Sequence, residues 1–213
     1  MIAPMSSAIE LAEFAEQGTI VFPLTVDQYH RMIKTGILEE GAPYELLDGV
    51  LVRKDRSAAG EDPMTVGHEH AWVVSKLTAL SAKFKRLGCH IRIQSPVTLP
   101  PHREPEPDGA VVIGTEDDFL DHHPGAEDVP CVIEVADASL RRDRTTKLRT
   151  YAAAGIGHYL IVNLPDRVIE AYTEPLTRKG RYGRSVTLSR RQNVEIPAAR
   201  GKRLSVAVRT LVP

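Results

Sequence analysis

An acidic residue inside an apolar, β-branched run is the feature that most constrains the fold. Residues 129–135 read Val-Pro-Cys-Val-Ile-Glu-Val, so Glu134 lies in a segment typical of a buried strand. A second run of this kind covers residues 108–113 and begins with Asp108. Both runs are bounded by Pro, Gly or Asp, and we therefore predict two neighbouring buried strands that each carry an acid.

A buried carboxylate needs a positive partner. Desolvation of an unpaired carboxylate costs several kcal/mol or more, which makes its ionised form unstable. Mg²⁺ is one suitable partner, since it binds oxygen ligands and keeps several waters. Such an ion polarises a phosphoryl oxygen and lowers the pKa of a bound water. Asp108 and Glu134 together therefore predict a divalent-metal phosphodiesterase site, although Asp108 alone is also consistent with an ordinary strand-end aspartate.

A helix is predicted to follow the strand of Glu134. Residues 141–155 include three consecutive alanines and end at Gly155, which is typical of a helix and its C-terminus. Asp143, Lys147 and Tyr151 recur at four-residue steps and so share one helix face. If that face turns back toward Glu134, the Lys147 ammonium lies beside the metal and can stabilise charge on a phosphate. A solvated helix face would show the same spacing, and the pattern leaves this alternative open.

Shorter patterns predict the remaining elements. Thr25 and Gln28 form a capping box that begins a helix ending at Lys34. Asp48-Gly49 is a two-residue hairpin turn between apolar segments. Helical spacing of apolar residues covers residues 66–87. Further strands are expected at residues 91–99, 159–164, 168–172, 185–189 and 204–208.

The polar and aromatic residues of this pattern occur in a familiar order. They are Tyr44, Glu45, Asp48, Gly49, His68, Pro107, Asp108, Glu134, Val135, Asp143, Lys147, Tyr151, Gly155 and Tyr159. In order and spacing this set resembles the Uma family of restriction-endonuclease-like proteins, in the PD-(D/E)XK nuclease superfamily. The resemblance covers about residues 20–210 and implies an α/β (α+β), restriction-endonuclease-like fold with a central mixed β-sheet flanked by helices.

The resemblance also implies a site for Mg²⁺ or Mn²⁺. Its implied metal ligands are Asp108, Glu134 and Val135. The usual lysine of the superfamily would fall at position 136, which is Ala136 here, and Lys147 on the following helix resembles a migrated replacement. The implied catalytic set is therefore Lys147, Asp108 and Glu134, joined by Glu45.

Three further residues are implied to support the site, namely His68, Asp143 and Tyr151. The patterns around Glu45 and His68 leave alternatives open. If Leu46 faces the core, strand alternation turns Glu45 to the other face, where a surface glutamate is equally consistent. His68 is expected near the start of a helix, where a capping or surface role is common.

Composition is that of one ordinary domain. The chain has 213 residues, of which 42% are hydrophobic and 26% charged. We predict an N-terminal extension over residues 1–22 and a single nuclease domain over residues 23–213. The sequence has neither an apolar run of about 18 residues nor a secretory signal, so we expect a cytoplasmic protein without a membrane span. Cys89 and Cys131 are far apart and are expected to be small core residues.

The charges are unevenly distributed along the chain. The net charge is −1, which is unlike an indiscriminate nucleic-acid binder. Acidic residues dominate residues 103–128, whereas Lys and Arg dominate residues 171–213. This arrangement is consistent with a basic rim around an acidic metal pocket, and also with a simple solvated basic face.

These observations favour a Mg²⁺-dependent endonuclease that cuts DNA, and we expect a homodimer because two-fold symmetric dimers are the commonest soluble oligomers. The missing lysine at position 136 motivates an alternative, a catalytically silent protein that binds nucleic acid or protein. A third hypothesis is a zinc hydrolase that uses His122 and His123, although no second pair of residues at ligand spacing supports it. The sequence has no G-x-S-x-G, P-loop or dinucleotide-binding signature.

Overall fold

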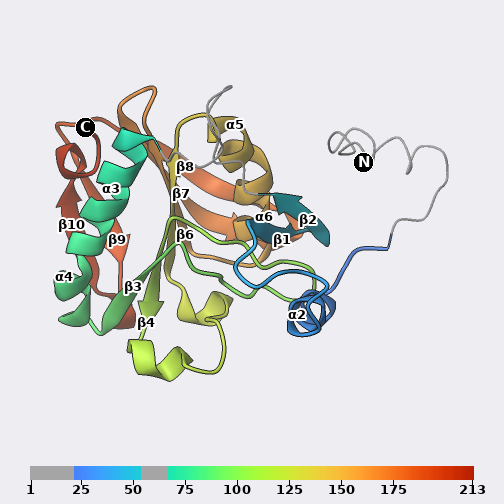
Figure 1. Ribbon diagram of the computed structural model, residues 1–213. Coiled ribbons are helices and arrows are strands. Elements are labelled where there is room, and N and C mark those ends of the chain that lie inside the picture. Colours follow the sequence, from blue (N-terminus) through green and yellow to red (C-terminus); the bar gives the residue numbers. More distant parts are fainter. Residues whose placement is uncertain (1–21, 54–66) are drawn as a thin grey trace.

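A six-stranded mixed sheet forms the centre of the protein (Figure 1). The computed structural model describes residues 22–53 and 67–213. Within the sheet, β5 and β6 run parallel and the other neighbouring pairs run antiparallel. In spatial order the strands are β3 (Cys89–Ile93), β4 (Gly109–Ile113), β5 (Cys131–Ala136), β6 (His158–Asn163), β7 (Val168–Leu176) and β8 (Arg181–Leu188). The predicted central mixed sheet flanked by helices is confirmed.

Helices and two small hairpins surround this sheet. The hairpins are β1 (Tyr44–Leu47) with β2 (Val50–Arg53), and β9 (Asn193–Pro197) with β10 (Arg203–Ala207). The longer helical segments are α2 (Val26–Lys34), α3 (His68–Ala79), α4 (Ser81–Lys85) and a continuous run of α5 (Leu140–Arg142), η3 (Asp143–Lys147) and α6 (Leu148–Ala153). Single short turns are η1 (Glu116–Phe119), η2 (Ala126–Asp128), η4 (Thr177–Lys179), η5 (Ala199–Gly201) and η6 (Val208–Thr210).

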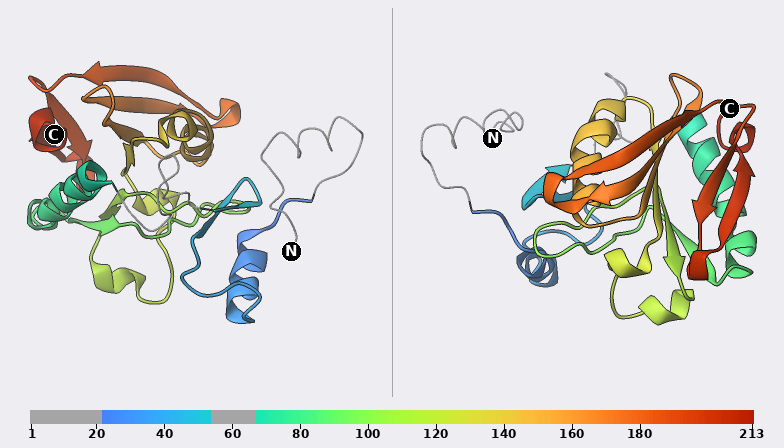
Figure 2. Two further views of the ribbon diagram at one scale, coloured as in Figure 1. Left: turned by 45° about the horizontal axis from the view of Figure 1, so that its top comes forward. Right: turned by 180° about the vertical axis from the view of Figure 1, so that it is seen from behind.

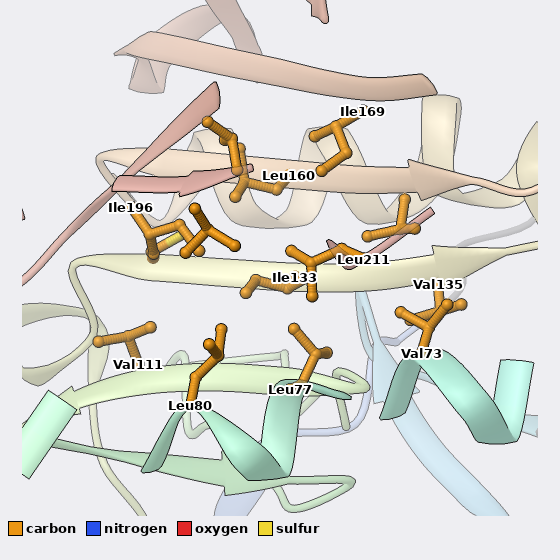
Figure 3. Packing of buried hydrophobic residues seen from close by; sticks show 14 of the residues in the cluster. Val73, Leu77, Leu80, Val111, Ile133, Val135, Leu160, Ile169, Ile196 and Leu211 are labelled. Carbon is orange, nitrogen blue, oxygen red and sulfur yellow. The ribbon is translucent and has the colours of Figure 1, made fainter. Parts of the chain in front are cut away.

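Both faces of β5 are buried, as its β-branched sequence predicts. Ile133 and Val135 point to one face, where they pack with Leu77 and Val73 of α3 and with residues of the β9–β10 hairpin (Figure 3). Val132 and Ala136 point to the opposite face, where they pack with Tyr151 of α6. Because side chains alternate along a strand, Glu134 shares the face covered by α6.

The two cover layers lie on opposite sides of the sheet. Helices α3 and α4 and the β9–β10 hairpin lie together at one side, and the α5–α6 helix and the β1–β2 hairpin lie at the other (Figures 1 and 2). Cys89 of β3 and Cys131 of β5 are both free and are buried on the side of the sheet that the first layer covers, as expected for small core residues. The first layer therefore supplies most of the apolar core, whereas the second layer carries the polar site.

The β1–β2 hairpin has the predicted Asp48-Gly49 turn. Asp48 and Gly49 have φ angles of 49° and 81°, as a two-residue turn matched to strand twist requires. The Asp48 carboxylate pairs with Arg103 and, at 2.7 Å, with Arg149 of α6. The backbone of Leu46 also exchanges hydrogen bonds with that of Glu104. These contacts fasten the hairpin to α6 and to the segment that precedes β4.

Several predicted element bounds are wrong. The strand predicted over residues 91–99 ends at Ile93, because Gln94 takes a positive φ of 46° and turns the chain. The helix predicted over residues 66–87 is divided at Leu80 into α3 and α4, and Val66 lies outside the described residues. Strand β9 was missed. The predicted N-terminal extension, apart from Phe22, also lies outside the described residues.

The remaining predicted elements occur close to their expected places. The capping box of Thr25 and Gln28 begins α2, which ends at Lys34 as predicted. Strands β7 and β8 are longer than predicted, since their hairpin continues to Leu176 and Arg181. Within the described part of the chain, none of the helices combines the length and apolar character needed to cross a membrane.

Glycine at the hairpin turn is expected to be required by packing as well as by φ. A Cβ on Gly49 would overlap the Cβ of Pro23, whereas a Cβ on Gly36, which also has positive φ, would meet nothing within 4 Å. We expect Gly36→Ala to lower the free energy of unfolding by roughly 1–2 kcal/mol, the cost of the left-handed backbone. Gly49→Ala should cost clearly more in the same urea titration. Equal losses would show that Pro23 does not pack against the turn.

Candidate active site

The two acids predicted to act together lie where β4 and β5 separate. The pairing of these strands ends at Gly109, opposite Ile133. Just beyond it, Asp108 Oδ2 accepts a hydrogen bond from the backbone N–H of Val135 at 2.8 Å. The backbone N–H of Asp108 in turn donates to Glu134 Oε2 at 3.4 Å. The carboxylate of Asp108 thus accepts a backbone N–H of β5 beyond the last pair of the two strands.

Val135 contributes its main chain to the same place. In a strand, the N–H and C=O of one residue point toward the same neighbouring strand. Since the N–H of Val135 points to Asp108, its carbonyl faces the gap that opens between β4 and β5. That carbonyl is the group through which Val135 could bind a cation.

Lys147 lies on the other side of Glu134. Its Nζ is 3.1 Å from Glu134 Oε1 and 2.7 Å from Glu45 Oε2. The relative exposures of Glu45, Glu134 and Lys147 are 2%, 5% and 3%, so the three charges are almost fully withdrawn from water. The Tyr151 hydroxyl donates to Glu134 Oε1 at 2.7 Å. The predicted approach of the Lys147 helix face to Glu134 is therefore present in the structure, and the solvated alternative is wrong.

Glu45 is brought in by the β1–β2 hairpin. The surface alternative for this residue is also wrong, because Glu45, Leu46 and Leu47 of β1 are all buried. The backbone N–H of Glu106 donates to Glu45 Oε2 at 3.2 Å, the same oxygen that meets Lys147. Glu45 therefore contacts the ammonium directly and lies beyond it from Glu134.

The helix that carries Lys147 contains a π-helical turn. In η3 the backbone N–H of Leu148 donates to the carbonyl of Asp143, five residues earlier. The same carbonyl accepts the Tyr159 hydroxyl at 3.0 Å, and the Asp143 carboxylate accepts the Ser139 hydroxyl at 2.6 Å. Such turns are rare and occur often at functional sites. Here the turn buries both of its end residues, Asp143 and Lys147, against the sheet.

The structure places His70, and not the predicted His68, beside the acids. His68 is exposed at the first position of α3, and no hydrogen bond or ion pair joins it to the acids within the described residues. His70 instead places Nε2 3.1 Å from Asp108 Oδ1. The available signal was helical spacing, because His70 precedes Val73 and Leu77 on the buried face of α3.

The pKa values of Glu134 and Asp143 are raised, whereas that of Asp108 is lowered. Burial, reinforced by Asp108, raises the pKa of Glu134 to about 8, although Lys147 opposes the change. Burial also raises the pKa of Asp143 to about 6. For Asp108, burial acts upward, but the hydrogen bond and charge of His70 outweigh it and the pKa is lowered.

The same acids raise the pKa values of the two cationic groups, Lys147 and His70. Burial alone would lower the pKa of Lys147, but Glu134 and Glu45 outweigh it, so the pKa is raised and the ammonium keeps its proton. Asp108 likewise outweighs burial at His70 and raises its pKa. Four carboxyl groups thus surround one ammonium and one imidazole, and this local excess of acidic oxygen suits a further cation.

A metal at this place would depend on few side chains. Residues 22–53 and 67–213 contain no group of three or more His, Cys, Asp or Glu side chains arranged to hold a metal ion. Mg²⁺ does not need such a group, because one or two carboxylates with carbonyl and water oxygens suffice. Asp108, Glu134 and the Val135 carbonyl provide oxygen donors of that type.

His122 and His123 do not form a zinc site in the described part of the chain. His122 pairs with the neighbouring Asp121 at 2.7 Å, whereas His123 contacts Arg92 at 3.3 Å. Both belong to the acidic segment that follows β4, at the end of that strand opposite to Asp108. Most acids of residues 103–128 therefore lie away from the candidate site.

Comparison of the sequence and of this fold with known proteins points to the class described as putative nucleases. The chain belongs to the Uma2 family, which is described as "Putative restriction endonuclease" and whose model matches residues 26–208. This membership bears out the resemblance noted in the sequence.

The fold also occurs in a solved structure. A crystal structure described as a putative nuclease belonging to DUF820 from Anabaena variabilis ATCC 29413 superposes with a TM-score of 0.64. The match covers 89% of this chain and 97% of the other chain at 15% sequence identity. At that identity the likeness shows a shared fold. None of the curated proteins matches this chain.

The raised pKa of Asp143 predicts a pH-dependent effect on stability. The folded-state pKa of about 6 lies above the ordinary value of 3.8, so the folded protein binds the proton more tightly than the unfolded chain does. Stability should therefore fall as pH rises from about 4 to about 6, and this loss should be complete above pH 6.

Asn at this position keeps a hydrogen-bond acceptor for Ser139 but does not ionise. Relative to the original protein, Asp143→Asn should gain stability over that pH window, by on the order of 2 kcal/mol at pH 7. Urea unfolding at several pH values measures the gain, with the exposed Asp117→Asn as the matched control. A difference between Asp143→Asn and the original protein that is the same at pH 4 and pH 7 would contradict the assignment.

Proposed function

We propose that this protein is a divalent-metal-dependent endonuclease that hydrolyses phosphodiester bonds in DNA. The observation that carries the proposal is the meeting of Asp108 and Glu134 at the separating ends of β4 and β5, with Lys147 on the far side of Glu134. Membership of a family described as restriction endonucleases supports a nucleic acid as the substrate. The choice of DNA and the expected homodimer are parts of the proposal.

The residues present fit Mg²⁺ or Mn²⁺. Asp108, Glu134 and the Val135 carbonyl would hold the ion through oxygen, which both metals accept. When bound, the ion would supply Lewis acidity, which activates water and neutralises charge on the phosphate. A bound cation would stabilise ionised Glu134, because its charge opposes the burial and the repulsion from Asp108 that raise the pKa of this residue.

Lys147 acts as a fixed positive charge in this proposal. Its raised pKa means that it retains its proton and does not serve as a general base. From its place beside Glu134 it can donate to the attacking water or to an oxygen of the phosphate, stabilising charge that develops during cleavage. Glu45 holds the ammonium from the other side, so its proposed role is to orient Lys147.

The hydrogen bonds of Asp108 prepare it as a ligand. His70 and Gln94 contact Oδ1, at 3.1 and 3.4 Å, and the N–H of Val135 donates to Oδ2. These contacts restrict rotation of the carboxylate before any ion arrives. In proteins such outer partners orient metal ligands and increase metal affinity.

Plasmid cleavage with Mg²⁺ or Mn²⁺ tests the proposal. We expect Asp108→Asn and Lys147→Met to lower the cleavage rate by roughly 100-fold or more, the usual effect of losing one group that stabilises the transition state. EDTA should abolish cleavage by the original protein. Asp117→Asn and Lys83→Met, which change exposed residues of the same types, are the matched controls and should cleave normally.

The outcome separates the nuclease from its alternative. Circular dichroism of each variant establishes that a lost activity is not a lost fold. Full Mg²⁺-dependent cleavage by folded Asp108→Asn or Lys147→Met would refute the assigned roles. If the original protein neither cleaves DNA nor binds Mn²⁺ in a calorimetric titration, the catalytically silent binding protein is the better explanation.

A further inference from the structure

Four tyrosines pack together on the face of the sheet that carries the site. The rings of Tyr151, Tyr159, Tyr172 and Tyr182 form a chain of contacts with centroid separations of 5.0 to 6.3 Å. Each hydroxyl has a different acceptor. The Tyr151 hydroxyl reaches Glu134, whereas that of Tyr182 donates to the backbone carbonyl of Ile156 at 2.9 Å. The cluster therefore contains one hydroxyl aimed at a proposed metal ligand and comparable hydroxyls that are not.

The two oxygens of Glu134 have different surroundings. Oε1 accepts from the Tyr151 hydroxyl at 2.7 Å and lies 3.1 Å from Lys147 Nζ. Oε2 faces the other way and meets the backbone N–H of Asp108 at 3.4 Å. One oxygen of the Glu134 carboxylate therefore faces two donors, and the other oxygen faces Asp108.

A restraint is needed to keep Oε1 and Oε2 of Glu134 in these different surroundings, and the glutamate side chain does not provide it by itself. The last torsion of a glutamate side chain is broad, so an isolated carboxylate rotates freely between its two oxygens. Lys147 also contacts Oε1, but its ammonium lies closer to Glu45, at 2.7 Å, than to Glu134, at 3.1 Å. Tyr151 is rigid, because its ring is 0% exposed and packs 5.0 Å from that of Tyr159.

We infer that Tyr151 is a positioning residue that holds Glu134 Oε1 and thereby leaves Oε2 facing Asp108 as the oxygen offered to a cation. The inference rests on the proposed function for the cation, but the orientation of Glu134 is a property of the protein alone. Tyr151 lies one helical turn after Lys147, the last residue of the π-helical turn. The same helix therefore supplies both Lys147 and Tyr151 to Glu134 Oε1.

Mn²⁺ titration calorimetry without DNA measures the consequence. Tyr151→Phe removes one hydroxyl and keeps the ring, and we expect it to weaken Mn²⁺ binding by roughly 10-fold to 100-fold, as for other outer partners of metal ligands. Tyr182→Phe is the matched control, because it removes a hydroxyl from the same cluster without touching Glu134, and it should bind Mn²⁺ as the original protein does. Unchanged affinity in Tyr151→Phe, or equal weakening in both variants, would overturn the inference.

Crystal structures provide two further readouts. In metal-free Tyr151→Phe, Glu134 should turn so that Oε2 no longer meets the Asp108 N–H, whereas Tyr182→Phe should leave it in place. A Glu134 that does not move in Tyr151→Phe overturns the positioning role. In crystals of the original protein soaked in Mn²⁺, the ion should contact Oε2. An ion bound through Oε1 or through Glu45 overturns the inference without any variant.

These measurements keep the two proposals apart. Absence of Mn²⁺ affinity in the original protein would count against the metal-dependent nuclease, and the metal-free structures of the two variants would still decide the role of Tyr151. Normal Mn²⁺ affinity in the original protein together with normal affinity in Tyr151→Phe would preserve the proposed nuclease and refute the positioning residue alone.

Discussion

The ion pairs of Lys147 with Glu45 and Glu134 are the interaction on which the arrangement of the site depends. All three groups are buried, and the Lys147 ammonium keeps its proton because the two acids outweigh the effect of burial on its pKa. Removing one partner from such a pair typically costs about 3–5 kcal/mol, since it leaves a buried charge without compensation. The pairs therefore join three separate parts of the chain: the β1–β2 hairpin, strand β5 and the α5–α6 helix.

The separation of β4 from β5 provides the second half of the site. Where their pairing ends, backbone groups of β5 lose a strand partner, and the Asp108 carboxylate accepts one of the N–H groups left there. Asp108 thus satisfies a backbone N–H of β5 and also adds a carboxylate to the candidate site. Glu134 connects the two halves, because one of its oxygens faces Asp108 and the other faces Lys147 and Tyr151.

Much of the fold could be predicted from the sequence, for identifiable reasons. Strands β4, β5 and β6 are short β-branched runs between turn residues, and α2 begins at a capping box, so local patterns specify them. Strand β9 was missed. The prediction for β3 continued too far, because the chain turns at Gln94 with a positive φ that no local pattern predicts. Among the site residues, His68 was implied by the family resemblance. The contact of His70 with Asp108 joins a helix to a distant strand end, which a local pattern does not specify.

The sequence by itself determined that Glu134 would be buried in a strand and that Asp143, Lys147 and Tyr151 would share a helix face, since both follow from local periodicity. Only the tertiary structure decided which groups meet. Glu45 lies far along the chain from Lys147, yet the hairpin that carries it is fastened to α6 through Asp48 and Arg149, and this places Glu45 against the ammonium. Contacts of that kind depend on how separate elements pack, and a side-chain pattern within one element contains no information about its neighbours in space.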